Sequence, residues 1–475
     1  MPPVTPSAAP APPFGAPSLA NVVRIGSDPF TNGASEHATE VEPSAAAFGT
    51  TIVAAFQAGR FFTFGSSDIS TATSLDGGAS WIAASLPGTT HYTLPSGPYD
   101  SISDPSVAYD ARHATWLVGA LPVNFSSAGV PGAVVSRSPD GLAWSAPIAV
   151  TSANETDNDK DWIACDNHAA SPYYGHCYIE WDNASTGLID MAVSGDGGAT
   201  WSTVSHPPGT AGGIGGQPLV LPDGTVAVVI NSIDTQQIYS FTSRDGGATW
   251  SAANIVQNVT DHLPAGNLRY VPFVTAAEDG QGKIYAVWSD CRFRTNCTQN
   301  DLVSILSADG VTWSAPARIP IDPLSSSVDH FLPGLAVDGA TSGSGAHVGV
   351  TYYSYANAQC TTSTCALSAD FIASQDGGAT WGSPQLLAGP MDLQWLASTH
   401  LGWMIGDYTA AAFVSGRPMA IAPIAVPLDG TFLQEAMYAP KAGAIAIQSS
   451  VRRSSAGEHP VPHARSDHGP RHIIP

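Results

Sequence analysis

The chain has 475 residues and a formal net charge of −22, with 12% charged and 43% hydrophobic residues. So acidic a protein repels phosphate backbones, which argues against nucleic-acid binding, and no apolar run is long enough for membrane insertion. Its 47 glycines and 38 prolines, without any long amphipathic helical pattern, indicate an all-β protein with many turns.

Residues 1–20 are rich in proline and alanine and are predicted to be an extended linker. They lack the basic and apolar run of a secretory signal. Elsewhere six cysteines form three close pairs, which we expect to be neighbour disulfides, although sequence alone leaves the connectivity open. Disulfides form in oxidising compartments, so we expect a secreted or extracellular protein whose signal is missing here; free thiols in a cytoplasmic protein are the alternative. The expected pairs are Cys165–Cys177, Cys291–Cys297 and Cys360–Cys365.

A short motif recurs six times between Ser74 and Trp381, at intervals of 49 to 67 residues. The copies read SLDGGASW, SPDGLAW, SGDGGATW, SRDGGATW, SADGVTW and SQDGGATW. Each is predicted to be a tight turn, in which the aspartate accepts backbone hydrogen bonds and the glycines supply positive φ. The tryptophan begins the next strand and is expected to bury its ring between neighbouring sheets. Repetition of this kind predicts a repeat architecture.

The motif resembles the Asp box (BNR repeat) of sialidases and related β-propellers. The resemblance covers nearly the whole chain between Val22 and Pro440, and it implies one β-propeller domain at residues 21–440. It also implies that the repeated turns lie on the face opposite the ligand site. The motif therefore identifies an architecture and not a chemistry.

An apolar run marked by proline or glycine precedes each motif and is predicted to be the first strand of a four-stranded blade. A seventh run, GDYTAAAF from Gly406, has a second and a third strand after it but no motif. Its fourth strand is expected from the N-terminus, NVVRIGS from Asn21, which would close the ring and leave no open edge. We therefore predict a seven-bladed β-propeller, with six blades as the alternative. The six runs that precede motifs begin at Glu42, Asp104, Asp161, Gln217, Tyr270 and Leu332.

The starts of the first strands and the loops between second and third strands share one face of such a ring, which is the expected ligand face. From position alone we predict Asp104, Asp407 and Tyr408 as catalytic residues. Ordinary roles remain open for them: Asp104 precedes Pro105, as in a simple strand-entry turn, and Tyr408 can serve packing in its apolar strand. The residues predicted to bind substrate are Glu42, Gln217, Arg269, Tyr270, Asp290, Arg292 and His330.

The loop WSDCRFRTNC places Asp290, Arg292 and Arg294 beside an expected disulfide. Two cations on a disulfide-linked loop in so acidic a protein could bind a carboxylate ligand. The alternative is an ordinary surface loop whose charges form salt bridges. The stretch ETDNDKD alternates Asp157, Asp159 and Asp161, like the opening of a calcium loop. The position of the EF-hand glycine holds Trp162, however, so a solvated loop is favoured and no metal or other cofactor is predicted.

Known sialidases use three arginines for the sugar carboxylate, the first in an Arg-Ile-Pro motif on the first strand of the first blade. They also use a tyrosine nucleophile with a glutamate, and an aspartate. Here the corresponding strand reads EVEPSAA, with Val41 in place of the arginine. Arg24-Ile25 is followed by Gly26, and Arg269 belongs to the fifth blade. We therefore expect no efficient release of sialic acid.

The resulting prediction is a secreted, monomeric, sialidase-like propeller that binds or acts on extracellular carbohydrate, with glycoside hydrolysis as its enzymatic form. A non-catalytic recognition or assembly scaffold is the alternative. Two carboxylates that converge in the axial pocket, one with a raised pKa, would indicate the enzyme, whereas exposed aromatics without such a pair would indicate a binding module. Residues 441–475 are predicted to be a disordered basic tail that contains histidines.

Overall fold

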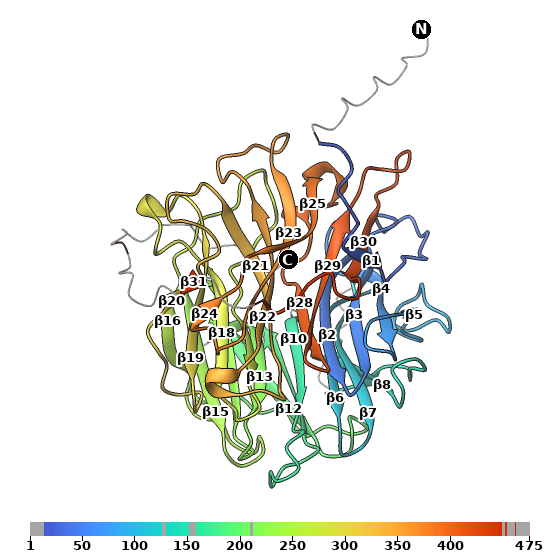
Figure 1. The fold of residues 1–475 in the computed structure, drawn as a ribbon. Helices are drawn as coiled ribbons and strands as arrows, with labels where there is room; N and C mark the ends of the chain where they lie inside the picture. The colour runs from blue at the N-terminus through green and yellow to red at the C-terminus, as the bar shows by residue number, and fades with distance from the viewer. Residues whose placement is uncertain are drawn as a thin grey trace.

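The computed structural model describes residues 14–125, 130–151, 158–209, 212–448, 452–453 and 461. This part of the chain is all-β, as predicted, and its strands run side by side in several sheets (Figure 1). Helix occurs in it only as three short 3₁₀ turns, at Thr295–Cys297, Gly343–Gly345 and Leu393–Trp395. No helix among the described residues is long and apolar enough to cross a membrane.

Most strands pair antiparallel with a strand next to them in the chain, so most of the larger sheets are meanders with a first strand on one side. The bridge between Ser66 and Ile102 joins two of these meanders into one eight-stranded sheet. The strands of that sheet are β2 (Glu40–Phe48), β3 (Thr51–Arg60), β4 (Ser66–Ser74), β5 (Ile82–Ser85), β6 (Ser101–Asp110), β7 (Thr115–Val123), β8 (Val134–Ser138) and β9 (Ile148–Ala149). The next sheet contains β10 (Asn158–Cys165), β11 (Cys177–Asn183) and β12 (Leu188–Ser194). It is followed by a sheet of β13 (Gly213–Val220), β14 (Val226–Ser232), β15 (Gln237–Ser243) and β16 (Asn254–Asn258). A further sheet contains β17 (Thr275–Glu278), β18 (Ile284–Asp290), β19 (Asp301–Ser307) and β20 (Ala317–Arg318). The last sheets contain β21 (Asp329–Val337), β22 (Val348–Tyr355), β23 (Ala366–Ser374) and β25 (Gln385–Asp392); and β28 (Ala410–Val414), β29 (Arg417–Ala425), β30 (Glu435–Pro440) and β1 (Val22–Arg24).

The first strands contact one another in chain order, and the last of them, β28, contacts β2. They surround a channel of about 340 Å³ whose wall is rich in alanine, for example Ala45–Ala47 and Ala410–Ala412. Small side chains suit this wall because seven strand segments approach the channel closely: Ser44–Phe48, Val107–Tyr109, Trp162–Cys165, Gln217–Leu219, Thr275–Glu278, Leu335–Val337 and Thr409–Phe413.

The N-terminal strand β1 completes the last sheet, as the sequence predicted. It pairs antiparallel with β30, with Val22 opposite Pro440 and Arg24 opposite Tyr438. The two ends of the domain are therefore joined by backbone hydrogen bonds, which leaves no free edge on β30.

The first strand before the fifth motif is shorter than predicted. Regular pairing begins at Thr275 rather than at Tyr270, and residues 270–274 run without strand geometry. Pro272 lies in that stretch, and a proline has no N–H to donate to a ladder.

All six repeated turns share one hydrogen-bond pattern. The serine hydroxyl donates to its aspartate Oδ1 and accepts from the N–H of a glycine. In the third copy Asp196 Oδ1 also accepts from the N–H groups of Ala199 and Thr200. The tryptophans are buried less uniformly than predicted: Trp250 and Trp381 are buried, whereas the other four are half-buried.

Replacing Ser194 by alanine should lower the free energy of unfolding by about 1–3 kcal/mol. The hydroxyl is 1% exposed and both donates and accepts, so its loss leaves the Gly198 N–H without this acceptor. Urea unfolding measures the change, and the exposed neighbouring position Thr203→Ala serves as the control. Equal stabilities of the two variants would contradict the structural role assigned to the turn.

The three predicted disulfides are confirmed, Cys165–Cys177, Cys291–Cys297 and Cys360–Cys365. The first links β10 to β11 at a position where the two residues already face each other in the ladder. Each pair closes only a short loop, so its effect is local to one hairpin.

Three parts of the predicted C-terminal tail lie against the domain. Residues 441–448 follow β30, and β31 (Arg452–Arg453) pairs with β24 (Thr380–Trp381), next to the last repeated turn. The N–H of Val461 donates to the Arg292 carbonyl. Most of the predicted linker and the remainder of the predicted tail lie outside the described residues.

Candidate functional site

The first strands carry the same irregularity near their starts. The pairing of β2, β6, β10, β13 and β21 with their neighbours shifts by a residue at one point. The residue at each shift has positive φ, which is costly for any residue except glycine and clusters at functional sites. These residues are Glu42 (55°), Asp104 (49°), Lys160 (40°), Gly215 (72°) and Leu332 (52°).

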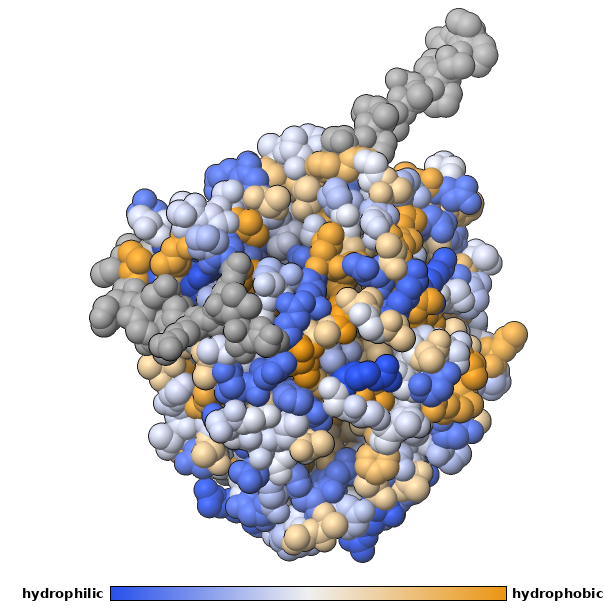
Figure 2. Space-filling model, in the orientation of Figure 1, coloured by the Kyte–Doolittle hydropathy of each residue, from blue (hydrophilic) through white to orange (hydrophobic). Residues whose placement is uncertain are grey.

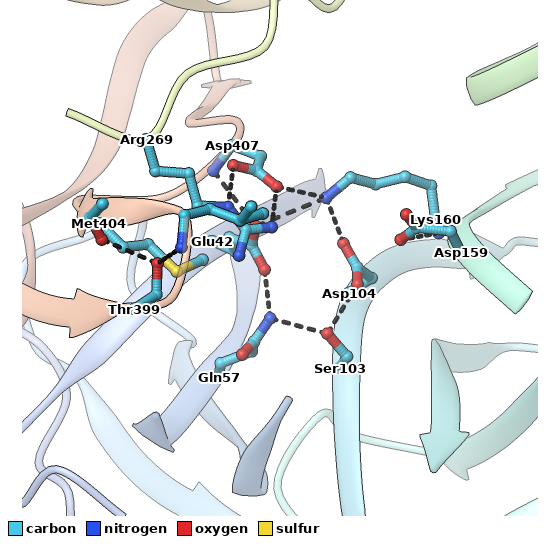
Figure 3. Close-up of polar contacts among 12 residues, drawn as sticks. Glu42, Gln57, Ser103, Asp104, Asp159, Lys160, Arg269, Thr399, Met404 and Asp407 are labelled. Carbon is cyan, nitrogen blue, oxygen red and sulfur yellow. Dashed lines mark hydrogen bonds and ion pairs between the residues drawn. The ribbon is translucent and has the colours of Figure 1, made fainter. Parts of the chain in front are cut away.

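Three of these bulges place charged side chains against one another at one end of the channel (Figure 3). The Lys160 ammonium lies 2.5 Å from Asp104 Oδ1, 3.3 Å from Asp407 Oδ2 and 3.5 Å from Glu42 Oε1. The side chains are almost inaccessible, at 6% exposure for Lys160 and 1–4% for the three carboxylates. One buried cation therefore holds together three carboxylates from separate strands and loops.

Two arginines complete this group, which we call the axial cluster: Glu42, Asp104, Lys160, Asp407, Arg269 and Arg60. Arg269 forms a bidentate pair with Asp407, with its Nε 2.8 Å from Asp407 Oδ1. Arg60 ends β3 and donates to the Gly65 carbonyl and, from Nε at 3.0 Å, to Met404 Sδ. Lys160 and Arg269 thus pair with the three carboxylates, as buried charges require, while Arg60 donates to neutral acceptors.

The carboxylates of the axial cluster differ strongly in acidity. Burial, with the negative charges of Asp104 and Asp407, raises the pKa of Glu42 to about 7, although Lys160 opposes the shift. Burial acts on Asp407 too, but Arg269 and Lys160 outweigh it and hold the pKa of Asp407 below its usual range. Burial disfavours the charged form of Lys160, yet the surrounding carboxylates keep its pKa well above the ordinary value. Glu42 therefore takes up a proton at a higher pH than the neighbouring Asp407.

Aromatic rings enclose the open side of Lys160. Its ammonium lies 4.8 Å from the Tyr408 ring centre and 5.3 Å from that of Phe273, distances at which cation–π attraction operates. These groups, with Trp162 and Gln217, line a cavity of about 20 Å³. A cavity of this size holds about one water molecule, so no larger ligand fits inside it.

The hairpin of β26 (Ala397–Thr399) and β27 (Gly402–Met404) lies against the axial cluster. Met404 contacts Arg60, while the Trp403 carbonyl accepts from the Arg269 N–H at 2.7 Å. The Trp403 N–H in turn donates to the Asn267 carbonyl at 2.9 Å. The hairpin thereby positions both arginines of the axial cluster.

The repeated turns lie at the other end of the sheets. Each follows the end of a third strand, which is antiparallel to the second and so runs in the direction of the first. The axial cluster lies at the starts of first strands, for example Glu42 in β2 and Asp104 in β6. The two features therefore occupy opposite ends of the sheets.

Five of the sequence-predicted site residues come together in or beside the axial cluster: Glu42, Asp104, Arg269, Asp407 and Tyr408. Gln217 lines the adjoining cavity and accepts from the Ala276 N–H. The remaining four lie elsewhere. Tyr270 packs its buried ring near Phe331, and His330 contacts the Asn300 carbonyl. Asp290 and Arg292 pair with each other at 2.6 Å, and Arg292 also reaches Gln257 and Asn258, so this loop satisfies its own charges.

The decisive residue that the sequence analysis missed is Lys160. It was treated as part of an acidic loop, whereas the structure places it in β10 at the same bulge position as Glu42 and Asp104. Glu42 and Asp104 are each followed by Pro-Ser, whereas Lys160 is followed by Asp161-Trp162, so no shared residue marks the equivalence. Gln57, which donates to both Glu42 and Ser103, likewise had no signal because it lies in mid-strand.

The predicted alternative of a calcium loop gains no support from the described part of that segment. Asp161 Oδ2 accepts from the Ser106 hydroxyl at 2.6 Å and Asp159 Oδ1 from the Lys160 N–H, while Asp157 lies outside the described residues. One other group, Asp301, Asp322 and His330, has ligand atoms within 4.8 Å of one another. Arg294 already pairs with both of these carboxylates at 2.6 Å, so a guanidinium occupies the place of a cation.

Neither a family model nor a curated protein matches this sequence. Solved structures that resemble it include a leech intramolecular trans-sialidase, with a TM-score of 0.47 and 15% identity over 70% of this chain and 67% of that one. The NanB sialidase from Streptococcus pneumoniae gives a TM-score of 0.46 and 14% identity over 68% and 66% of the two chains. A protein of unknown function from Dyadobacter fermentans DSM 18053 gives 0.46 and 13% over 89% and 98%. Similarity at this level carries no conclusion about chemistry.

Proposed function

We propose that the chain is a secreted, seven-bladed β-propeller that recognises carbohydrate on the face above the axial cluster. The blade count is supported by the first strands β2, β6, β10, β13, β17, β21 and β28, which contact one another in order and return from β28 to β2. All seven contribute to the wall of one channel. The pairing of β1 with β30 supports closure through the N-terminus.

The observation that carries the functional proposal is the axial cluster itself. Charged side chains converge there on strained backbone, at the end of the channel away from the repeated turns, and nearby loops bring aromatic rings. Carboxylates, guanidinium groups and aromatic faces are the groups that recognise a hydroxyl-rich ring. Because the cavity beside Lys160 holds about one water, the ligand is proposed to lie over the axial cluster, on the surrounding loops.

Glycoside hydrolysis is the second candidate, and the unequal acidity of two carboxylates favours it. A general acid must be protonated near neutral pH while its partner stays ionised, and Glu42 and Asp407 differ in this sense. The two residues are adjacent, since the Asp407 N–H lies 3.2 Å from Glu42 Oε1. Both side chains are only 1% exposed, so a substrate would reach them only if the surrounding side chains move.

The test is a glycan array with neutral and sialylated members, run beside 4-nitrophenyl glycosides. We expect saturable binding of at least one neutral glycan and no efficient release of sialic acid, since Val41 occupies the place of the first sialidase arginine. Turnover of a glycoside that falls at least ~100-fold in Glu42→Gln would establish the hydrolase. The matched control is Glu278→Gln, because Glu278 also has a pKa raised to about 7 but lies at the other end of the channel. Absence of both binding and turnover would leave the scaffold alternative.

A further inference from the structure

Figure 2 shows hydrophobic and hydrophilic residues interspersed on the face that it draws. On a surface without a large apolar patch, a small ligand is most readily bound in a pocket. One pocket, which we call the rim pocket, has a volume of about 350 Å³ and borders the axial cluster. The residues that line it and matter for recognition are Ser35, Glu36, His37, Ser398, Trp403 and Phe432.

The rim pocket adjoins the axial cluster through short contacts. The Glu36 N–H donates to the Arg60 carbonyl at 2.8 Å. On β27, Trp403 lines the rim pocket while the next residue, Met404, contacts Arg60. Successive strand residues point to opposite sides, so one hairpin presents its tryptophan to the pocket and its methionine to the axial cluster.

Aromatic rings form much of the wall of the rim pocket. Phe432 is 53% exposed, although burial of a phenylalanine side chain would be favourable. Its ring centre lies 5.8 Å from that of His37. Trp403 is half-buried, and its backbone is fixed by hydrogen bonds to Asn267 and Arg269. Rigid, partly exposed rings of this kind offer an apolar surface to a ligand at low entropic cost.

The polar groups of the rim pocket select a hydroxylated, uncharged ligand. Glu36 Oε2 accepts from the Ser398 N–H at 2.6 Å, which holds the carboxylate in place and leaves Oε1 for a donor. Burial raises the pKa of Glu36, with the Ser398 N–H and Arg60 acting against the shift. The hydroxyl of Ser35 lies 3.3 Å from His37 Nδ1. A carboxylate accepts hydrogen bonds from sugar hydroxyls but repels an anionic sugar.

We propose that the rim pocket is a binding subsite for one neutral pyranose ring of an oligosaccharide. Trp403 and Phe432 contact the apolar faces of the ring, and Glu36 accepts hydrogen bonds from its hydroxyls. The volume fits a single sugar with its waters, in the lower range of small-molecule pockets. This inference rests on the proposed carbohydrate recognition and assigns its ligand class.

Isothermal titration with cellohexaose, laminarihexaose, maltohexaose and chitohexaose tests the assignment, with 3′-sialyllactose as the anionic comparison. We expect at least one neutral hexasaccharide to bind, and Phe432→Ala and Glu36→Gln each to weaken it about tenfold or more. Phe48→Ala is the matched control, because Phe48 is 47% exposed, lies outside the rim pocket and ends β2, away from the bulge at Glu42, and it should leave the affinity unchanged. Near-ultraviolet circular dichroism verifies that each variant is folded.

The outcomes separate this inference from the proposed function. Binding of a neutral hexasaccharide that is unaffected by both Phe432→Ala and Glu36→Gln overturns the rim pocket and leaves carbohydrate recognition standing. Preference for 3′-sialyllactose overturns the ligand class. If the wild-type chain binds none of these sugars and nothing on the glycan array, the proposed function itself fails.

Discussion

Replacing Lys160 by methionine should lower the free energy of unfolding by about 3–5 kcal/mol, the cost of leaving buried charges without their partner. Lys160 is the common neighbour of Glu42, Asp104 and Asp407, at 3.5, 2.5 and 3.3 Å. Methionine preserves most of the volume of the side chain, so the loss reports on charge rather than on a cavity. Urea unfolding at pH 8 measures the effect.

The control for this substitution is Lys283→Met. Lys283 lies over the Tyr285 ring at 5.3 Å on a half-buried turn, so its loss should cost about 1 kcal/mol or less. The double variant Lys160→Met/Asp104→Asn lacks one of the carboxylates that Lys160→Met leaves without a partner. Its free energy of unfolding should therefore be higher than that of Lys160→Met alone. The cost of Lys160→Met should also shrink at pH 5, where Glu42 can take up a proton. A cost below about 1 kcal/mol at pH 8 would show that the axial cluster is solvated rather than buried.

Acidification from pH 7 to pH 5 should stabilise the protein, by about 2–3 kcal/mol for each of two buried glutamates. Burial raises the pKa of Glu40 and of Glu180 to about 8 each. Between the ordinary glutamate pKa near 4.5 and this folded value, the folded state holds a proton that the unfolded state has released. Stability from these groups is thus complete below about pH 4.5 and is lost as the pH rises through about 8.

The opposite trend should appear in stronger acid. Hydrogen bonds within the repeated turns lower the pKa of Asp140, Asp245 and their equivalents, and Arg269 with Lys160 lowers that of Asp407 despite burial. Those groups stabilise the fold only while ionised, so their contribution is lost as the pH falls below about 4. The stability maximum is therefore expected near pH 4–5. Thermal unfolding across pH 3–9 measures it, and Glu40→Gln should flatten the slope between pH 5 and 7. Stability that rises from pH 5 to 7 would refute this account.

The sequence was most informative where a physical device repeats. The six copies of one turn indicated which end of each sheet lies opposite the ligand face. The seventh apolar run, at Gly406, is not followed by the motif, and this led to the prediction that the N-terminal strand pairs with β30. The close cysteine pairs were equally readable, because each spans a hairpin or short loop. Local patterns of this kind depend on neighbouring residues alone, which is why they can be predicted from the sequence.

The site was predicted only in part, since its chemistry depends on which strand starts meet at the axis. Position alone selected Glu42, Asp104 and Asp407. It also selected Asp290 and Arg292, which lie outside the axial cluster and form an ion pair with each other. Lys160 was not predicted because the acidic residues next to it in the sequence indicated a solvent-exposed loop. Its burial is stabilised by carboxylates that lie more than fifty residues away in the sequence, on both sides of it. No local pattern encodes that compensation.

The pairing of β1 with β30 also sets the order in which the protein can mature. During synthesis Val22–Arg24 emerges first, but its partner strand, Glu435–Pro440, is almost the last part of the domain to leave the ribosome. Until then the last sheet cannot be completed, and the edge of β29 that β30 covers stays available to other chains. Contacts between residues so distant in sequence also form slowly. A nascent chain is therefore expected to be most prone to aggregation until Glu435–Pro440 has emerged, when β1 can pair with β30 and complete the last sheet.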